Sequence, residues 1–249
     1  MSNEGINLKT IAIDIGHNVS FDGGAVGIRK EDELNKLVGE ALIENFRAIG
    51  INVVNCMPKS AISLYDSLNQ RCISANTGNV DFFISIHHNV GGGEGAEVLC
   101  YGSGIAEEVG NSILNELRNI GLKNRGVKYR KDLFVLNKTK MKAILVECAF
   151  CDSEKDMTGY DCCKIANAIF NGICSKFKIS LGAHNLNNCD INTNINNNES
   201  SSVLYHTVVK GDTLSGIAKR YRVSIDMLAE INGIGDRNSI IVGQMIKIN

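Results

Sequence analysis

The sequence has 249 residues, of which 44% are hydrophobic and 21% are charged, and its formal net charge is −1. This composition is typical of a globular protein with one or two domains and excludes wholesale disorder. The near-neutral charge does not favour a nucleic-acid partner, and since no apolar run approaches the roughly 18 residues of a membrane span, we expect no membrane insertion.

The first half of the chain alternates strand-like and helix-like segments. A β-branched apolar run at 10–15 predicts a strand, and apolar residues at helical spacing over 33–49 predict an amphipathic helix. A second strand at 51–54 and a second helix at 61–75 repeat the pattern. The apolar run at 82–86 then predicts a buried strand.

The same alternation continues in the second half. Residues 96–101 and 143–146 predict two more strands, whereas 105–120 and 162–177 predict helices. The glycine-rich segment 91–95 predicts a loop. Together these elements predict an α/β domain with a mostly parallel sheet flanked by helices.

The composition changes abruptly after this region. Asn and Ser dominate residues 183–202, which hold too few apolar side chains to fold alone. We therefore expect a first domain at 1–180, a linker at 181–203 and a small second domain at 204–249.

Nine cysteines are scattered along the chain, mostly within apolar segments. We interpret them as small buried side chains of a protein made in a reducing compartment. An alternative is a metal knuckle built on Cys148, Cys151, Cys162 and Cys163, although no second spaced pair completes it. The N-terminal segment lacks the long apolar core of a signal peptide, so we expect synthesis in the cytoplasm without one.

Four polar residues lie at the ends of predicted elements. In α/β proteins, functional residues commonly lie at the carboxyl ends of the strands. His17, His87 and Glu147 follow predicted strands, and Glu31 opens the first long helix. Two imidazoles and one carboxylate form the ligand set of many catalytic zinc sites, and a further carboxylate can act as general base. The alternative is that both histidines satisfy hydrogen bonds at strand ends, and dispersed residues alone do not separate the two interpretations.

A family resemblance lies in the ordered segments IAIDIGHN, GAVGIRKEDELN, LNQR, FFISIHHN, GAEVLCY and LFVLNKTKMKAILVECAF. Over residues 8–178 the chain resembles the zinc-dependent N-acetylmuramoyl-L-alanine amidases with a phosphorylase/hydrolase-like α/β domain. By matching positions, the resemblance implies that His17, Glu31 and His87 bind Zn²⁺ and that Glu147 is the catalytic carboxylate. It also implies hydrolysis of the amide bond between N-acetylmuramic acid and L-alanine in peptidoglycan.

Two of these assignments have competitors. In the family the carboxylate ligand precedes a helix Asn by four residues, which favours Glu31 over Glu33 because Asn35 follows at that spacing. The family pattern S-I-H-x-N favours His87, and alternation along a strand turns His88 to the opposite side.

Two further positions matter for the turn and the sheet. Arg71 matches a family arginine and is expected to form an ion pair beneath the sheet. Asn18 replaces the glycine that usually follows the first histidine, and because Asn tolerates left-handed geometry, the turn can survive.

Residues 205–249 resemble a LysM module, a small βααβ domain that binds N-acetylglucosamine-containing glycans. We expect strands at 206–209 and 245–248 and helices that begin near Thr213 and Ser224. The resemblance implies a groove between two loops, with the glycan-binding candidates Gly211, Asp212, Thr213, Leu214, Asn232, Gly233 and Ile234. Helix capping is an alternative role for Asp212 and Thr213, and both roles can coexist.

The resemblances favour a phage or prophage endolysin that is made in the cytoplasm and acts on the cell wall after release, with peptidoglycan as its partner. A sporulation mother-cell autolysin would have the same activity. Two rival interpretations are a zinc peptidase that cuts within the stem peptide and a non-catalytic LysM protein that only binds the wall.

Overall fold

The computed structural model describes residues 8–180 and 205–248, apart from 210, 222, 238, 242 and 243. The chain divides into two compact units, Met1–Asn192 and Thr193–Asn249. The linker predicted at 181–203 lies outside the described residues.

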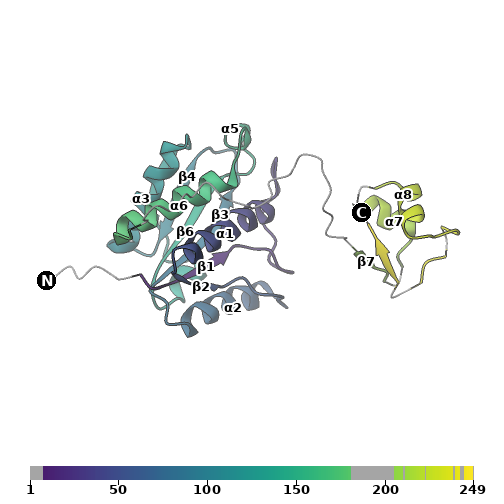
Figure 1. Cartoon of the computed structure of the whole chain (residues 1–249), viewed down its shortest axis with the longest axis horizontal. Helices are drawn as coiled ribbons and strands as arrows, with labels where there is room; N and C mark the ends of the chain where they lie inside the picture. Colours follow the sequence, from purple (N-terminus) through teal and green to yellow (C-terminus); the bar gives the residue numbers. More distant parts are fainter. Residues whose placement is uncertain are drawn as a thin grey trace. The chain divides into compact units, whose positions relative to one another are not determined.

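The larger unit is built on one six-stranded sheet with the strand order β2-β1-β3-β6-β4-β5 (Figure 1). The strands are β1 (Thr10–Ile15), β2 (Asn52–Asn55), β3 (Phe82–Asn89), β4 (Ala96–Cys100), β5 (Asn124–Tyr129) and β6 (Lys142–Phe150). Strands β4 and β6 pair antiparallel, whereas the other neighbours pair in parallel. This confirms the mostly parallel α/β sheet predicted from the sequence.

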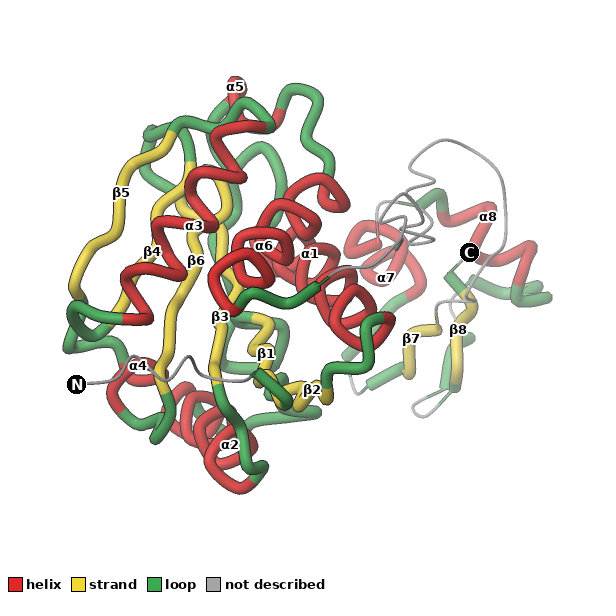
Figure 2. Tube along the Cα trace, turned by 60° about the vertical axis from the view of Figure 1, so that its left-hand side comes forward, coloured by secondary structure: helices red, strands yellow, loops and turns green. Residues whose placement is uncertain are grey.

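Helices cover both faces of this sheet (Figure 2). The helices are α1 (Glu31–Ala48), α2 (Leu64–Thr77), α3 (Ile105–Asn119), α4 (Phe134–Asn137), α5 (Glu154–Met157) and α6 (Cys162–Phe177). Helices α1, α3 and α6 contribute to the larger apolar cluster on one face, and α2 and α4 contribute to the smaller cluster on the other.

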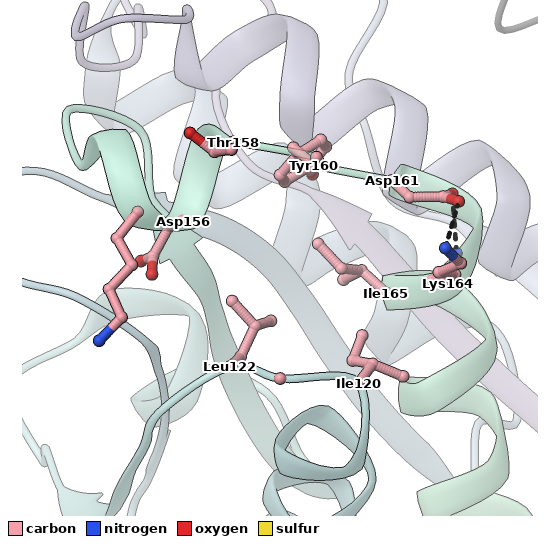
Figure 3. Close-up of a pocket in the computed structure, with 11 residues that line it drawn as sticks. Ile120, Leu122, Asp156, Thr158, Tyr160, Asp161, Lys164 and Ile165 are labelled. Atoms are coloured by element: carbon pink, nitrogen blue, oxygen red, sulfur yellow. Dashed lines mark hydrogen bonds and ion pairs between the residues drawn. The ribbon is translucent and has the colours of Figure 1, made fainter.

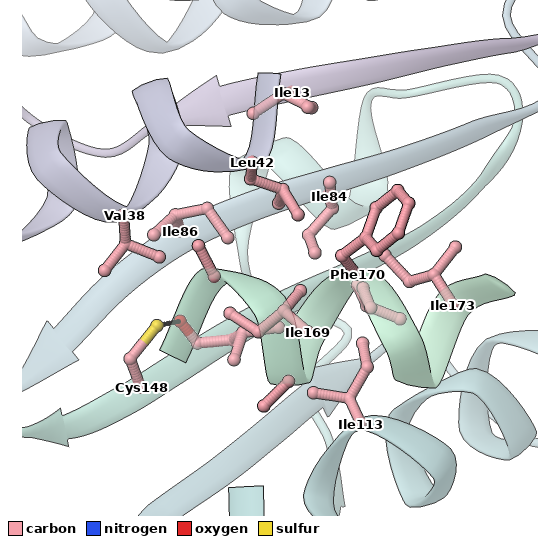
Figure 4. Packing of buried hydrophobic residues seen from close by; sticks show 14 of the residues in the cluster. Ile13, Val38, Leu42, Ile84, Ile86, Ile113, Cys148, Ile169, Phe170 and Ile173 are labelled. Carbon is pink, nitrogen blue, oxygen red and sulfur yellow. Dashed lines mark hydrogen bonds between the residues drawn. The ribbon is translucent and has the colours of Figure 1, made fainter. Parts of the chain in front are cut away.

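Alternation along the strands separates the core from the site. Ile13, Ile84 and Ile86 point into the larger cluster, where they meet Ile169 and Phe170 of α6 (Figure 4). Because successive strand residues point to opposite faces, the positions between these apolar residues face the α2 side of the sheet. Polar side chains at these positions therefore lie on the α2 side of the sheet, and the larger apolar cluster on the other face contains none of them.

Several element boundaries differ from the sequence-based expectation. Helix α1 begins at Glu31, two residues before the predicted start, and strands β3 and β6 extend to Asn89 and Phe150. His87 and Glu147 consequently lie within strands and not just after them. Strand β5 and the four-residue helices α4 and α5 were not predicted.

Eight of the nine cysteines lie in the described region, and all of these except the half-buried Cys163 are buried. Within that region the only group of side chains positioned to hold a metal ion contains histidine and glutamate, so a cysteine knuckle is not formed there. Cys189 lies outside the described residues.

The smaller unit has the βααβ order expected from its sequence. Its elements are β7 (Tyr205–Thr207), α7 (Leu214–Tyr221), α8 (Ile225–Ile231) and β8 (Met245–Lys247). Strands β7 and β8 pair antiparallel, and a small core that includes Leu214, Leu228 and Ile246 lies between strands and helices. Across the described residues of both units, no helix has the length and apolarity that crossing a membrane requires.

Candidate metal centre and active site

The turn after β1 places the first histidine of the site. His17 and Asn18 both adopt left-handed backbone geometry, with φ of 60° and 67°. The Asn18 side-chain amide donates to the Gly16 and Asp32 carbonyl oxygens, which holds the turn. A side chain at Gly16 would meet the His87 ring within 2.3 Å, so the ring packs directly on this backbone. Asn18 thus tolerates the left-handed geometry that was expected of it.

Three side chains from separate elements meet beside this turn. The Glu31 Oε1 atom lies 3.3 Å from His17 Nε2 and 3.1 Å from His87 Nδ1. The three potential ligand atoms all lie within 4.8 Å of one another. A tetrahedral zinc ion bonded at about 2.0–2.1 Å separates its ligand atoms by about 3.3 Å, so the donor set and its spacing fit Zn²⁺.

The charges of this cluster favour a cation between the three side chains. Burial alone would lower the pKa of His17, but hydrogen bonds with Asp22 and Glu31 outweigh it and raise that pKa to about 10. Burial would raise the pKa of Glu31, but its contacts with both imidazoles and the Ala25 N–H hold it well below its usual range. Asp22 and Glu31 thus stabilise a positive charge on protonated His17, at the place where a bound metal ion would supply the positive charge.

The structure separates the two competing carboxylates. Glu31 is buried in the first turn of α1, where the helix dipole favours its negative charge, and its Oε2 accepts from the Ala25 N–H at 2.9 Å. Glu33 is 58% exposed and pairs with Lys30. Glu31, as expected from the sequence, is the carboxylate that reaches the histidines.

Asp22 lies behind His17 and was not recognised from the sequence. Its Oδ1 accepts from His17 Nδ1 at 2.8 Å, and its Oδ2 accepts from the Ser67 hydroxyl at 2.6 Å. Metal-binding histidines commonly donate their second N–H to a carboxylate, which fixes the tautomer and turns the other nitrogen toward the metal. An acidic residue five positions after the histidine, in the same loop, was the available signal.

Arg71 of α2 ties this turn to the sheet. It is buried, and its Nη1 donates to Asp14 of β1 at 2.7 Å. The guanidinium also donates to the backbone oxygens of Ile15 and His17. This confirms the expected ion pair beneath the sheet.

The His88 ring points away from the candidate metal ligands, as alternation predicts, and forms the middle of a buried hydrogen-bond chain from Tyr160 to Asn35. The Tyr160 hydroxyl donates to His88 Nε2 and His88 Nδ1 donates to the Asn35 Oδ1, both at 2.8 Å. Asn35 then donates to the Gly16 oxygen at 3.2 Å and to Glu31 Oε1 at 3.5 Å. Burial lowers the pKa of His88 to about 3, so it is neutral, as this order of donors requires.

Tyr160 also lines a small pocket of about 130 Å³ on the α6 side of the sheet (Figure 3). Ile120, Leu122 and Ile165 form its apolar wall, and Asp161 pairs with Lys164 at its edge. The pocket therefore lies behind the hydrogen-bond chain, on the face opposite Glu147.

Glu147 lies next to His87 on the α2 side of the sheet. In β6 it is in register with His87 of β3 and with Glu97 of β4. Its Oε2 is buried and has no hydrogen-bond partner among the described residues. Burial raises the pKa of Glu147 to about 7, with the charge of His87 lowering it and those of Glu31 and Glu97 raising it. Such a carboxyl group can exchange a proton near neutral pH.

An apolar cavity of about 180 Å³ adjoins His17 and His87. Its wall comes from α2, α4 and the segment before α4, and includes Leu64, Leu68 and Phe134. It leaves room for the uncharged part of a ligand beside the potential metal site.

The candidate glycan-binding residues of the smaller unit have different environments. Gly211, Thr213 and Gly233 are exposed, while Asp212 and Ile234 are half-buried. Leu214 belongs to the core, and the side chain of Asn232 bonds the backbone of Leu228 and Lys247.

The capping role expected of Thr213 is present in the structure. Thr213 Oγ1 accepts from the Gly216 N–H at 3.1 Å and thereby caps α7. Asp212 accepts from His206 Nε2 at 2.8 Å and from the Val209 N–H at 2.9 Å. Asp212 therefore holds the loop between β7 and α7.

Fold and site together define an α/β protein with a potential metal centre and an adjacent buried carboxylate at the carboxyl end of its sheet. The chain belongs to the N-acetylmuramoyl-L-alanine amidase family, whose sequence profile matches residues 11–175. The LysM domain profile matches residues 206–249.

Named relatives agree with this membership. The chain is 31% identical over 180 residues to the N-acetylmuramoyl-L-alanine amidase CwlM of Bacillus licheniformis, covering 70% of each chain. It is 36% identical over 157 residues to an uncharacterized protein of Clostridium perfringens, covering 60% of this chain and 46% of that one. The chain thus spans about half the length of the first curated relatives it matches, at 46% and 45%.

A solved structure matches the larger unit. The catalytic domain of the CD27L endolysin targeting Clostridia difficile superposes with a TM-score of 0.60 and 30% identity. The match covers 67% of this chain and 97% of that domain.

Proposed function

We propose that this protein hydrolyses the amide bond between N-acetylmuramic acid and the L-alanine of the peptidoglycan stem peptide, and that it requires Zn²⁺. The convergence of His17, Glu31 and His87 beside Glu147, whose buried Oε2 has no hydrogen-bond partner in the described part of the chain, carries the proposal. Family membership supports the same bond as the substrate.

In the proposed reaction the three clustered side chains hold the metal ion. When bound, Zn²⁺ supplies Lewis-acid chemistry that polarises the amide carbonyl and makes water a better nucleophile. Its positive charge also favours the ionised form of Glu147, the form that a general base needs.

Glu147 moves the proton. Its Oε2 accepts the proton of the attacking water and then donates it to the departing alanine nitrogen, since an amine is a poor leaving group without that proton. Asp22 bonds His17 Nδ1, so that His17 Nε2 faces Glu31 and His87, where the metal ion would bind. The Asn35 amide donates to Glu31 Oε1 and helps to orient that carboxylate.

The presence of a LysM unit supports the proposal that the substrate is a polymer. A wall-binding module raises the local concentration of a catalytic unit at an insoluble glycan. We propose that the protein acts on the cell wall after its synthesis in the cytoplasm, in the manner of a phage endolysin, with a sporulation autolysin as the alternative biological setting.

Digestion of purified cell walls tests the proposal. We expect new L-alanine amino termini with intact glycan, loss of this activity after chelation, and its return with Zn²⁺. Internal cuts in the stem peptide would point to a peptidase, and binding without cleavage would point to a wall-binding protein.

The variant Glu147→Gln separates catalysis from metal binding. Removal of a general acid-base group lowers turnover by about 10²- to 10⁴-fold, and we expect zinc content to stay unchanged. The exposed Glu33→Gln is the matched control and should retain activity. Near-normal activity of Glu147→Gln would contradict the assigned role.

A further inference from the structure

A charged cluster lies beyond Glu147 on the α2 side of the sheet, and the proposed reaction leaves it unused. We call Glu97, Arg125 and Lys128 the β4–β5 cluster. Glu97 Oε2 accepts from Arg125 Nε at 2.8 Å and from Lys128 Nζ at 2.6 Å. Asn89 Nδ2 lies 3.4 Å from its Oε1.

The register of the strands places this cluster beside the proposed catalytic carboxylate. Glu97 and Glu147 are directly opposed in the antiparallel pair of β4 and β6. Side chains opposed in this way have Cβ atoms about 4.5–5.5 Å apart and share a face of the sheet. Arg125 and Lys128 belong to β5, two strands from Glu147, and their cationic groups reach back to Glu97 on β4, on the side of β6 opposite His87.

The cluster has a surplus of positive charge that faces solvent. The Glu97 side chain is only 8% exposed, whereas those of Arg125 and Lys128 are 29% and 47% exposed. Hydrogen bonds from both cations outweigh burial and lower the pKa of Glu97, so it is ionised at neutral pH. Two cations against one carboxylate leave a net charge of about +1, which favours an anionic ligand.

Arg125 is held in place for such a contact. Its guanidinium lies 4.8 Å from the centre of the Phe150 ring, and its Nη1 bonds the Glu94 backbone oxygen at 3.4 Å. Among the described residues these bonds use two of its five N–H groups. Arg125 also borders an open groove of about 460 Å³ with Gly92, Gly93 and Asp152.

We propose that Arg125 and Lys128 form a subsite for the free carboxylate of the second stem-peptide residue. The inference rests on the proposed function, which places the scissile amide between His87 and Glu147. Two extended residues span at most about 7 Å, so a carboxylate on the second residue reaches the neighbouring strand β4, where the Arg125 and Lys128 side chains meet at Glu97. Amidation of that carboxylate removes the charge and the paired acceptor oxygens that arginine recognises.

Two synthetic N-acetylmuramoyl peptides test the subsite. They differ only at the second residue, which is D-Glu with a free α-carboxylate in one and D-isoglutamine in the other. Their dissociation constants are measured in the zinc-loaded Glu147→Gln protein, so that binding does not depend on turnover. We expect at least tenfold tighter binding of the acid than of the amide, since hydrogen bonds to charged groups are the stronger class.

Substitution of the cations should remove this preference selectively. In the same background, Arg125→Gln and Lys128→Gln should each bring the acid-to-amide ratio close to one while changing the affinity for the amide by less than about threefold. Arg47→Gln, which removes an exposed cation from α1 on the other side of the sheet, should leave the ratio unchanged.

The outcomes separate the subsite from the proposed function. Equal affinity for the two peptides, or an Arg125→Gln variant that weakens both equally, would overturn the subsite. Cleavage of the same peptides by the unsubstituted protein tests the bond independently. A preserved affinity ratio with no cleavage would support the subsite and refute the proposed reaction.

Discussion

Asp22 controls which nitrogen of His17 faces the metal cluster. Its Oδ2 receives the Ser67 hydroxyl at 2.6 Å and faces Arg71 Nη2 at 3.4 Å, so that side of the group must be an acceptor. Its Oδ1 then accepts the Nδ1 proton of His17. Once a metal ion displaces the second proton of His17, the Nε2 lone pair would be directed toward Glu31 and His87, as a metal ligand requires.

Substitution of Asp22 by Asn should therefore weaken zinc binding although its shape is the same. The amide oxygen will turn to Arg71 and Ser67, because arginine can only donate. The amide N–H₂ will then face His17 and force its proton onto Nε2. We expect about 10- to 100-fold weaker zinc affinity, measured by competition with a chromophoric chelator.

Thermal unfolding of the metal-free Asp22→Asn protein provides the control for folding. The exposed Glu33→Gln protein provides the control for charge, and its zinc affinity should match that of the unsubstituted protein. An Asp22→Asn protein that folds normally and binds zinc with unchanged affinity would show that Asp22 does not set the tautomer.

Sequence patterns could predict the candidate metal ligands but not the side chains that hold them in place. Family positions and strand alternation pointed to His87 and turned His88 to the other face, and the structure places both residues in that way. Tyr160 is 72 residues away from His88, and their hydrogen bond forms only when α6 packs on the sheet. No local spacing carries information about such a partner.

At the scale of elements, burial decided which strands were predictable. Strands β1 and β3 consist largely of buried apolar residues, and their runs stand out in the sequence. Strand β5, with the sequence NRGVKY, forms the edge of the sheet and has no fully buried residue. Because its side chains are mostly polar, no apolar pattern predicts this strand. The position of Arg125 and Lys128 beside Glu97 therefore could not be predicted from the sequence either.

The pair of helices α3 and α6 depends on a close approach at Gly172. A Cβ atom there would lie 2.6 Å from the Ile113 Cα and 2.7 Å from its backbone nitrogen. Backbone atoms cannot rotate away as a flexible side chain can, so the two helices would have to separate. The position thus requires glycine although alanine is intrinsically the better helix former.

Gly172→Ala should therefore destabilise the catalytic unit by about 1–3 kcal/mol, the usual range for an overpacked core. Urea unfolding followed by circular dichroism measures the change. Gly102→Ala is the control, since a Cβ atom there meets nothing within 4 Å. Unchanged stability of Gly172→Ala would mean that the α3–α6 contact is loose enough to absorb a methyl group.

At the scale of the whole molecule, the two units divide the proposed work. The larger unit contains the candidate metal ligands, Glu147 and the β4–β5 cluster. The LysM unit has a small core, and a domain of this size is easily unfolded by a single buried charge. Wall binding can thus be removed without shortening the chain.

Leu214→Asp makes this test in the full-length protein. Leu214 is 1% exposed, and an unpaired carboxylate at that position should unfold the LysM unit. We expect loss of co-sedimentation with purified walls and, at low protein concentration, about 10- to 100-fold slower wall hydrolysis. Hydrolysis of a soluble muramoyl peptide should stay within twofold, because its cleavage needs no polymer binding. Ser239→Asp adds the same charge at an exposed position and should leave all three measurements unchanged. If Leu214→Asp slowed soluble and insoluble substrates equally, the two units would not act separately, and the LysM unit would contribute to catalysis itself.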